Sequence, residues 1–300
     1  MLVRGDIMFL NEDYYAQPPT HERITEGVFS LAENYPEHCK VFTVGQSVLG
    51  KEIYGVLLGK AQGATLFVGG THGGEWLTTL LLLYFLDDLL NSISQNLVFA
   101  DINIKKTLQT RGLIIVPALN PDGIEIALHE AKNTCNKNHP LWQANAHGVD
   151  INHNFNAGWK KLHRMEQAAG IVRGSPSQYG GPHAESEPET KAICKLCTSL
   201  NLRQAYSFHS QGEEIYYKYG AHTPPRSRLM AELLADTSGY KPIAQGGLAS
   251  HGGLKDWFIE TLHRPAFTIE IGKGTNPLPI SQLIPIYTTL KETLALAVIL

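Results

Sequence analysis

The sequence is poor in cysteine and has no block of one charge, and each absence narrows the possible functions. Four cysteines occur in 300 residues without a spacing typical of disulfides, which favours a reducing compartment. Cys194 and Cys197 form one CxxC, but no second pair or nearby histidine pair completes a metal site, so we interpret them as helix packing. The net charge of −3 and the lack of a basic cluster argue against nucleic acid as a partner.

Long hydrophobic runs and internal repeats are also absent. The most apolar segment, residues 77–86, ends at Asp87 and is shorter than the roughly 20 residues that cross a bilayer. Residues 1–17 lack the apolar core of a signal peptide. We therefore expect a soluble cytoplasmic protein without a membrane partner, and the sequence leaves its oligomeric state open.

The most informative segment is LFVGGTHGGEWLTTL, residues 66–80, which places His72 and Glu75 after an apolar strand and a glycine-rich turn. An imidazole and a carboxylate at that position are suited to zinc, which needs a third protein ligand in a catalytic site. His209, at the end of the strand-like run 202–209, can supply it. Taken alone, His209 could equally cap its strand through a backbone carbonyl.

A fourth side chain points to catalysis. Glu270 lies in the apolar, β-branched run 266–271, where a carboxylate is costly to bury unless it is paired or functional. A glutamate near a metal-activated water can take its proton and deliver it to a leaving amine. The alternative is a glutamate on the solvent face of an edge strand.

These pieces occur within a set of ordered blocks that resembles the zinc carboxypeptidase family from about residue 25 to the C-terminus. The order and spacing of the blocks are more specific than any single motif. The blocks are HGGEW at 72–76, NPDG at 120–123, GVDIN at 148–152, ESEPET at 185–190, SFHS at 207–210, KDW at 255–257 and FTIE at 267–270.

The resemblance implies both a fold and a set of roles. His72, Glu75 and His209 would bind one zinc ion per chain, and Glu270 would be the general base. The implied fold class is α/β: a single domain with a central mixed sheet of about eight strands and helices on both faces. Residues 1–20 would form an N-terminal extension and residues 21–300 the peptidase domain.

The departures from the family concern the substrate. Family carboxypeptidases have an arginine that forks onto the terminal carboxylate, and His153 stands in its place. An imidazole cannot make that planar two-bond fork. A second arginine has no counterpart between Gly123 and Asp150, Gly74 stands where digestive enzymes often have arginine, and Leu248 replaces a mobile tyrosine. Removal of C-terminal residues from ordinary peptides is therefore disfavoured, although it remains the alternative function.

Three segments, NHNFNAGW at 152–159, GGP at 180–182 ahead of ESEPET, and IEIGKGTNPLP at 269–279, are similar to one bacterial branch of the family. Enzymes of that branch hydrolyse the γ-D-glutamyl-meso-diaminopimelate bond of peptidoglycan stem peptides. The expected partner is therefore a peptidoglycan-derived peptide, which displays several carboxylates and a distant ammonium. The residues expected to bind it are Asn152, His153, Lys273 and, more weakly, His251. Lys273 and His251 could instead be solvated loop residues, and the whole chain could be a wall-peptide binder without turnover.

The remaining expectations concern local structure. NPDG is typical of a turn, residues 124–147 show no period and predict an irregular loop with short helical pieces, and Asp150 either orients a zinc-binding histidine or caps the loop before Asn152. The expected helices are 20–35, 75–90, one opening at Ser186 and one in 280–300, and the expected strands are 41–45, 53–58, 64–69 and 111–117.

Overall fold

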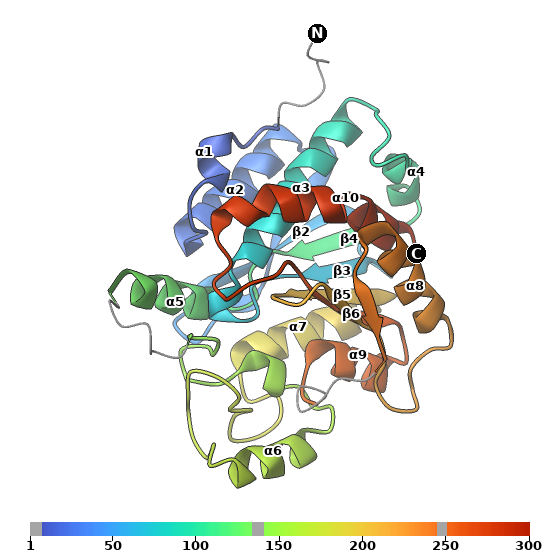
Figure 1. Cartoon of the computed structure of the whole chain (residues 1–300). Helices are drawn as coiled ribbons and strands as arrows, with labels where there is room; N and C mark the ends of the chain where they lie inside the picture. The colour runs from blue at the N-terminus through green and yellow to red at the C-terminus, as the bar shows by residue number, and fades with distance from the viewer. Residues whose placement is uncertain (1–7, 134–140, 245–250) are drawn as a thin grey trace.

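The computed structural model of the chain describes residues 8–133, 141–244 and 251–300. Its centre is one eight-stranded mixed sheet in the order β1-β2-β4-β3-β5-β8-β6-β7 (Figure 1). The strands are β1 Cys39–Gln46, β2 Glu52–Gly59, β3 Thr65–Val68, β4 Gly112–Val116, β5 Gln204–His209, β6 Glu214–Tyr216, β7 Lys241–Ile243 and β8 Ala266–Glu270. The predicted α/β fold with a mixed sheet is confirmed.

Helices cover both faces of this sheet, as expected. The α-helices are α1 Glu12–Tyr15, α2 His21–Asn34, α3 Leu77–Ser94, α4 Ile104–Leu108, α5 Pro121–Asn133, α6 Trp159–Ala168, α7 Pro188–Ser199, α8 Arg226–Ser238, α9 Leu254–Leu262 and α10 Leu283–Ile299. Three short 3₁₀ helices are η1 Gly73–Glu75, η2 Ile151–His153 and η3 Ile280–Gln282. Helices α2, α3 and α10 lie over one face, and α7 and α9 lie over the other (Figure 1).

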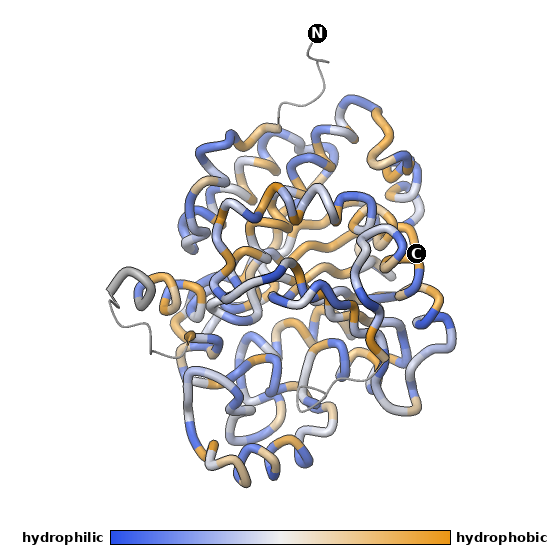
Figure 2. Tube along the Cα trace, viewed as in Figure 1, coloured by the Kyte–Doolittle hydropathy of each residue, from blue (hydrophilic) through white to orange (hydrophobic). Residues whose placement is uncertain are grey.

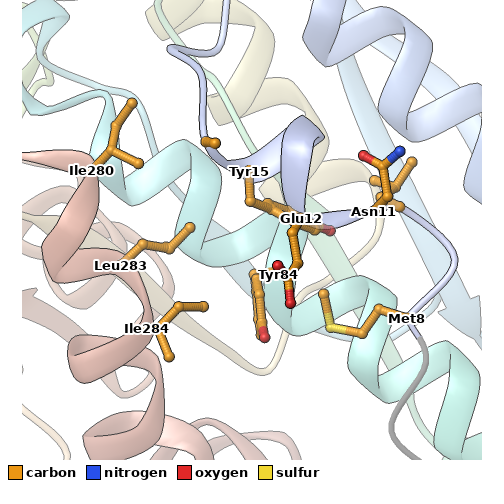
Figure 3. Close-up of a pocket in the computed structure, with 10 residues that line it drawn as sticks. Met8, Asn11, Glu12, Tyr15, Tyr84, Ile280, Leu283 and Ile284 are labelled. Carbon is orange, nitrogen blue, oxygen red and sulfur yellow. The ribbon is translucent and has the colours of Figure 1, made fainter.

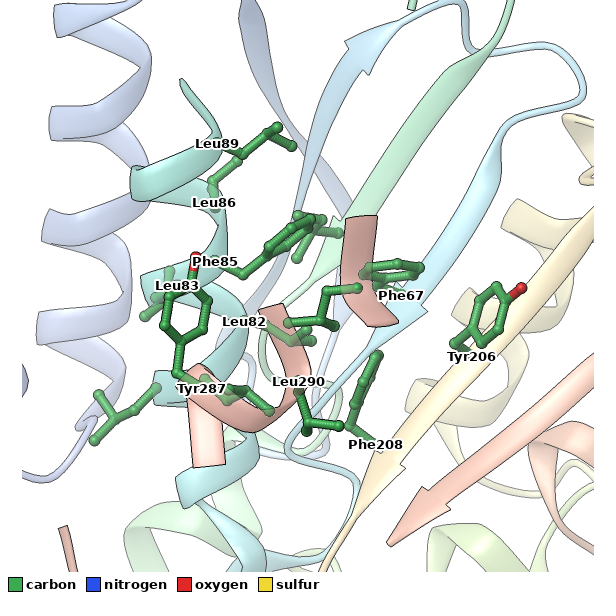
Figure 4. Close-up of a cluster of buried hydrophobic side chains, with 14 of the residues drawn as sticks. Phe67, Leu82, Leu83, Phe85, Leu86, Leu89, Tyr206, Phe208, Tyr287 and Leu290 are labelled. Carbon is green, nitrogen blue, oxygen red and sulfur yellow. The ribbon is translucent and has the colours of Figure 1, made fainter. Parts of the chain in front are cut away.

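The central strands are apolar on both sides because they are buried between these helices, and Figure 2 shows them as the most hydrophobic part of the trace. On the α3 and α10 side, Phe67 of β3 packs in a cluster with Phe85, Phe208 and Leu290 (Figure 4). A core of this kind holds the sheet rigid, and with it the strand ends that carry the functional residues.

Helix α3 ends at Ser94, beyond the predicted end at residue 90, and Asp87 lies within it. Asp87 is buried there because its carboxylate accepts hydrogen bonds from the backbone N–H groups of Phe9 and Leu10 and from the hydroxyl of Tyr15. The stretch Gly73–Ser94 is long and apolar enough to cross a membrane by length and composition, but 78% of its most apolar window is buried inside the fold. This burial identifies the stretch as a core helix of the fold.

The expectation for residues 120–147 is wrong in its first half, where helix α5 occupies Pro121–Asn133. The side chain of Asn120 accepts a hydrogen bond from the N–H of Gly123 at 2.9 Å, so Asn-Pro begins a helix rather than a simple turn. The later part of the segment, at residues 134–140, lies outside the described residues.

Two smaller expectations can be compared with the structure. Cys194 and Cys197 are buried on helix α7, where burial raises the pKa of both thiols, so the prediction of helix packing is confirmed. Tyr14 and Tyr15 of the supposed N-terminal extension are buried in the main core. The boundary at residue 21 stays a prediction.

Candidate metal centre and active site

Three parallel strands, β3, β5 and β8, bring the predicted residues to one edge of the sheet. In open α/β sheets this carboxyl edge is where sites form. Strand β3 leads through a glycine turn into η1, which carries Glu75, and β5 and β8 end at His209 and Glu270. A side chain at Gly73 would put its Cβ 2.2 Å from the carbonyl oxygen of Gly123. The glycine is required because η1 lies directly against helix α5.

The three predicted ligands meet at this edge. His72 Nδ1 lies 2.9 Å from Glu75 Oε1, His209 Nδ1 lies 3.0 Å from Glu75 Oε2, and the two Nδ1 atoms are 3.3 Å apart. A tetrahedral zinc ion with bonds of about 2.0–2.1 Å separates its ligand atoms by about 3.3 Å. Among the described residues, this is the only group of three or more such side chains arranged to hold a metal ion. The donor set and spacing fit zinc.

The far nitrogens of both histidines have partners of their own. His72 Nε2 lies 3.1 Å from Asp150 Oδ1, and His209 Nε2 lies 3.0 Å from the hydroxyl oxygen of Ser207. Such outer contacts fix the ring orientation and direct Nδ1 at the metal. Asp150 also accepts hydrogen bonds from the N–H groups of Asn152 and Gln178, so it both orients a ligand and caps η2.

Replacing Asp150 by asparagine should weaken zinc binding by about 10–100-fold, because His72 loses the carboxylate that orients it. The zinc dissociation constant, measured by competition with a chromogenic chelator, checks this. Asp236, an exposed acid on α8, provides the matched Asp→Asn control. An affinity equal to that of the unmodified protein would contradict the role of Asp150.

The charged groups of the metal centre shift one another's pKa values. Burial raises the pKa of Glu75, but His72 and His209 outweigh this effect and lower it to about 2. Burial lowers the pKa of His72, but Glu75 and Asp150 outweigh it and raise this pKa well above its usual value. Glu75 is therefore ionised at neutral pH, as a metal ligand must be.

Glu270 differs from Glu75 because no hydrogen bond or ion pair holds its carboxylate among the described residues. Strand pairing places it directly beside His209. Burial, and after it the charge of Glu75, raises the pKa of Glu270 to about 8. A bound cation reverses such a shift, because its positive charge stabilises the carboxylate. The carboxylate of Glu270 thus lies next to the metal centre without a partner among the described residues.

Zinc binding at pH 7 should release protons from His72 and Glu270, because both groups have raised pKa values without the metal. Glu270→Gln should release about one fewer. Folding raises the pKa of Glu270 in the metal-free protein. The free energy of unfolding that Glu270 contributes is therefore lost as the pH rises towards 8. Calorimetry in buffers of different ionisation enthalpy measures the number of protons released. An equal number in Glu270→Gln and in the unmodified protein would contradict the raised pKa of Glu270.

Two of the predicted substrate residues, Asn152 and His153, are linked to the metal centre through Asp150. Asn152 donates its N–H to Asp150, and its side-chain oxygen accepts from the N–H of Leu254 at 3.3 Å. His153 Nδ1 lies 3.1 Å from Glu166 Oε1 on helix α6. Burial lowers the pKa of His153, but Asp150 and then Glu166 outweigh it, and the pKa is raised.

The other two predicted substrate residues are held by different neighbours. Lys273 is exposed and forms an ion pair with Glu213. His251 Nδ1 lies 3.1 Å from the hydroxyl of Tyr219. Neither contact joins them to the metal ligands, and their roles in binding stay predictions. Leu248, discussed above for the missing tyrosine, lies outside the described residues.

The structure adds residues that the motifs did not indicate. Gln143 Nε2 donates to Glu75 Oε1 at 3.3 Å, and the buried carboxylate of Glu166 holds His153. Glu214 lies directly opposite Glu270 on the neighbouring strand. The position of each of these three residues depends on contacts between distant segments of the chain. The sequence indicated only that Glu214 begins a strand-like run.

A separate cavity of about 680 Å³ lies on the far side of α3, between that helix, α1 and α10 (Figure 3). Tyr84, Leu283 and Ile284 are among the residues that line it. It contains none of the metal-centre residues. The chemistry is therefore assigned to the strand edge and not to this cavity.

Comparison with known proteins agrees with the site. A family model for zinc carboxypeptidases matches residues 24–293. Gamma-D-glutamyl-L-diamino acid endopeptidase 1 of Lysinibacillus sphaericus is 34% identical over 256 residues, which are 81% of this chain and 63% of that protein. This chain therefore spans less than two thirds of that relative's length.

Solved structures agree on the fold. Bovine thrombin-activatable fibrinolysis inhibitor, in complex with tick carboxypeptidase inhibitor, superposes with a TM-score of 0.75 at 20% identity, covering 95% of this chain and 97% of that one. Murein-tripeptide amidase MpaA from Escherichia coli O157 gives a TM-score of 0.57 at 23% identity, covering 85% and 91%. With the family model spanning most of the sequence and zinc-binding geometry at its strand edge, this chain belongs to the zinc carboxypeptidase family.

Proposed function

We propose that this protein is a zinc metallopeptidase that hydrolyses the γ-D-glutamyl-meso-diaminopimelate bond of peptidoglycan stem peptides. The observation that supports peptide hydrolysis is the pairing of a zinc-fitting triad, His72, Glu75 and His209, with an unpartnered Glu270 beside it. A zinc ion bound there would acidify a water molecule and polarise the scissile carbonyl.

The protein's own groups then divide the work. Glu270 accepts the proton of the attacking water and returns it to the nitrogen that leaves. Asp150 and Ser207 hold the two histidine rings in place, so that the centre needs little rearrangement during the reaction. The buried sheet edge keeps these groups in a fixed relation.

The substrate part of the proposal rests on two further observations. The relative with 34% identity is named for γ-D-glutamyl-L-diamino acid bonds. In addition, His153 stands where carboxypeptidases of the family have arginine, and its ring is held by Glu166. Asp150 and Glu166 raise the pKa of His153 and so favour its charged form, but an imidazolium cannot make the bidentate fork that a plain C-terminal carboxylate receives from arginine.

The test is incubation of zinc-loaded protein with L-Ala-γ-D-Glu-meso-diaminopimelate, followed by mass spectrometry of the products. We expect free diaminopimelate, and none after chelation of the metal. A panel of ordinary peptides tests the alternative, because a carboxypeptidase would release their C-terminal residues without a γ-linkage. Zinc-dependent release from that panel, without cleavage of the γ-linked peptide, would replace this proposal with the alternative.

A further inference from the structure

A second carboxylate stands next to the general base. Strands β6 and β8 pair in antiparallel fashion with Glu214 opposite Glu270, and β5 and β8 pair in parallel with His209 beside Glu270. Residues directly opposite each other in paired strands project from the same face of the sheet. His209, Glu270 and Glu214 therefore form one row across three adjacent strand ends.

Glu214 is partly open to solvent, and no ion pair includes it among the described residues. The hydroxyl of Tyr216 donates a hydrogen bond to Oε2 of Glu214 at 2.5 Å. Tyr216 is two residues further along the strand and so lies on the same face, while Ile215 between them points into the core. The other oxygen of Glu214 is left to accept a hydrogen bond from a ligand.

Gly212 lies beside this carboxylate. A Cβ added there would lie 3.5 Å from Glu214 Oε2 and 3.5 Å from Glu270 Cβ, in contact with both side chains. Gly212 thus passes close over the pair without a side chain of its own.

Carboxylates directly opposite each other in paired strands repel when both are ionised, and Glu214 has no cationic partner among the described residues. A cationic group of the substrate would relieve the repulsion and form a charge-assisted hydrogen bond. The geometry therefore favours a positively charged ligand at Glu214.

We propose that Glu214 is a specificity-determining residue that binds the distal ammonium of the residue leaving from the substrate. This inference rests on the proposed function, in which Glu270 delivers a proton to the leaving nitrogen and the leaving residue therefore lies beside Glu270. Diaminopimelate carries a second amine a few carbon–carbon bonds from that nitrogen. Glu214 would select a diamino acid at this position.

The experiment compares two substrates that differ only in this charge: the tripeptide L-Ala-γ-D-Glu-meso-diaminopimelate and the same peptide with its distal amine acetylated. The unmodified protein should prefer the free amine. Glu214→Gln should lower kcat/KM for the free-amine peptide by about 10–100-fold, as expected for a hydrogen bond to a charged group, and leave the acetylated peptide unchanged. Glu232→Gln, the same substitution on an exposed face of α8, is the matched control.

Two results would overturn the inference while leaving the proposed function intact. One is equal cleavage of both peptides by the unmodified protein. The other is an equal loss on both peptides in Glu214→Gln, accompanied by a shifted pH profile, which would mean that Glu214 acts only on the base. A protein that cleaves neither peptide would contradict the proposed function instead.

Binding decides the inference independently of turnover. Calorimetric titration of zinc-loaded protein with free meso-diaminopimelate and with its mono-N-acetyl derivative should show a preference for the free diamine. That preference should disappear in Glu214→Gln and persist in Glu232→Gln. An equal affinity for the two ligands in the unmodified protein would contradict the role of Glu214.

Discussion

Replacing Glu270 by glutamine is expected to lower turnover by about 10²–10⁴-fold while leaving zinc bound, because the substitution removes a proton acceptor and keeps its shape. Glu270 has no hydrogen-bond or ion-pair partner among the described residues and does not belong to the ligand triad, so the fold and the metal affinity should be little changed. Steady-state kinetics together with zinc analysis of the purified variant measures both quantities.

The matched control is Glu260→Gln, the same substitution on a partly exposed side chain of helix α9 that forms an ion pair with His222. Its turnover should equal that of the unmodified protein. Full turnover in Glu270→Gln with zinc bound would show that another group takes the proton. Loss of zinc from that variant would instead make Glu270 a ligand, contrary to the geometry.

The second large effect is expected for His209→Ala, which removes a metal ligand. Zinc affinity should fall by more than the roughly 10–100-fold predicted for the outer partner Asp150, because a metal bond is lost and not only its orientation. Turnover should fall to the level of the chelated protein. Equilibrium dialysis against buffered zinc measures the affinity, and turnover measured across the same zinc series shows whether added metal restores activity.

Ser207→Ala gives the comparison for this experiment, because the hydroxyl of Ser207 lies 3.0 Å from the far nitrogen of His209 and Ser207 is not in the ligand triad. It should weaken zinc binding far less than His209→Ala does. Equal zinc affinities in His209→Ala and the unmodified protein would contradict the assignment of the ligand triad. A loss confined to Ser207→Ala would contradict it as well.

The metal half of the site could be predicted from the sequence for a physical reason. His72 and Glu75 are close along the chain, and the glycines around them fit a tight turn at a strand end. His209 and Glu270 each end a strand, and parallel strand ends meet at one edge of a sheet. Residue type and strand position therefore indicated these four residues, and the ordered blocks of the family resemblance implied their roles. For Asp150 the sequence left two roles open, and the structure shows that one carboxylate fills both.

The other half depends on contacts that no local pattern records. Glu214 lies opposite Glu270 because of the register of β6 against β8. Glu166 contacts His153 because helix α6 packs against η2. A local sequence pattern also gave a wrong prediction where it is compatible with two kinds of local structure. Asn120-Pro121 is compatible with a turn and with a helix start, and the helix forms because Asn120 caps it.

The central claim is that the metal centre is conventional and the substrate is γ-linked. The most direct test is the zinc-dependent rate on L-Ala-γ-D-Glu-meso-diaminopimelate beside its isomer joined through the α-carboxyl of D-Glu. We predict diaminopimelate release from the γ-linked peptide and little from the α-linked one, with both rates abolished by chelation. Equal or faster cleavage of the α-linked isomer would contradict the account.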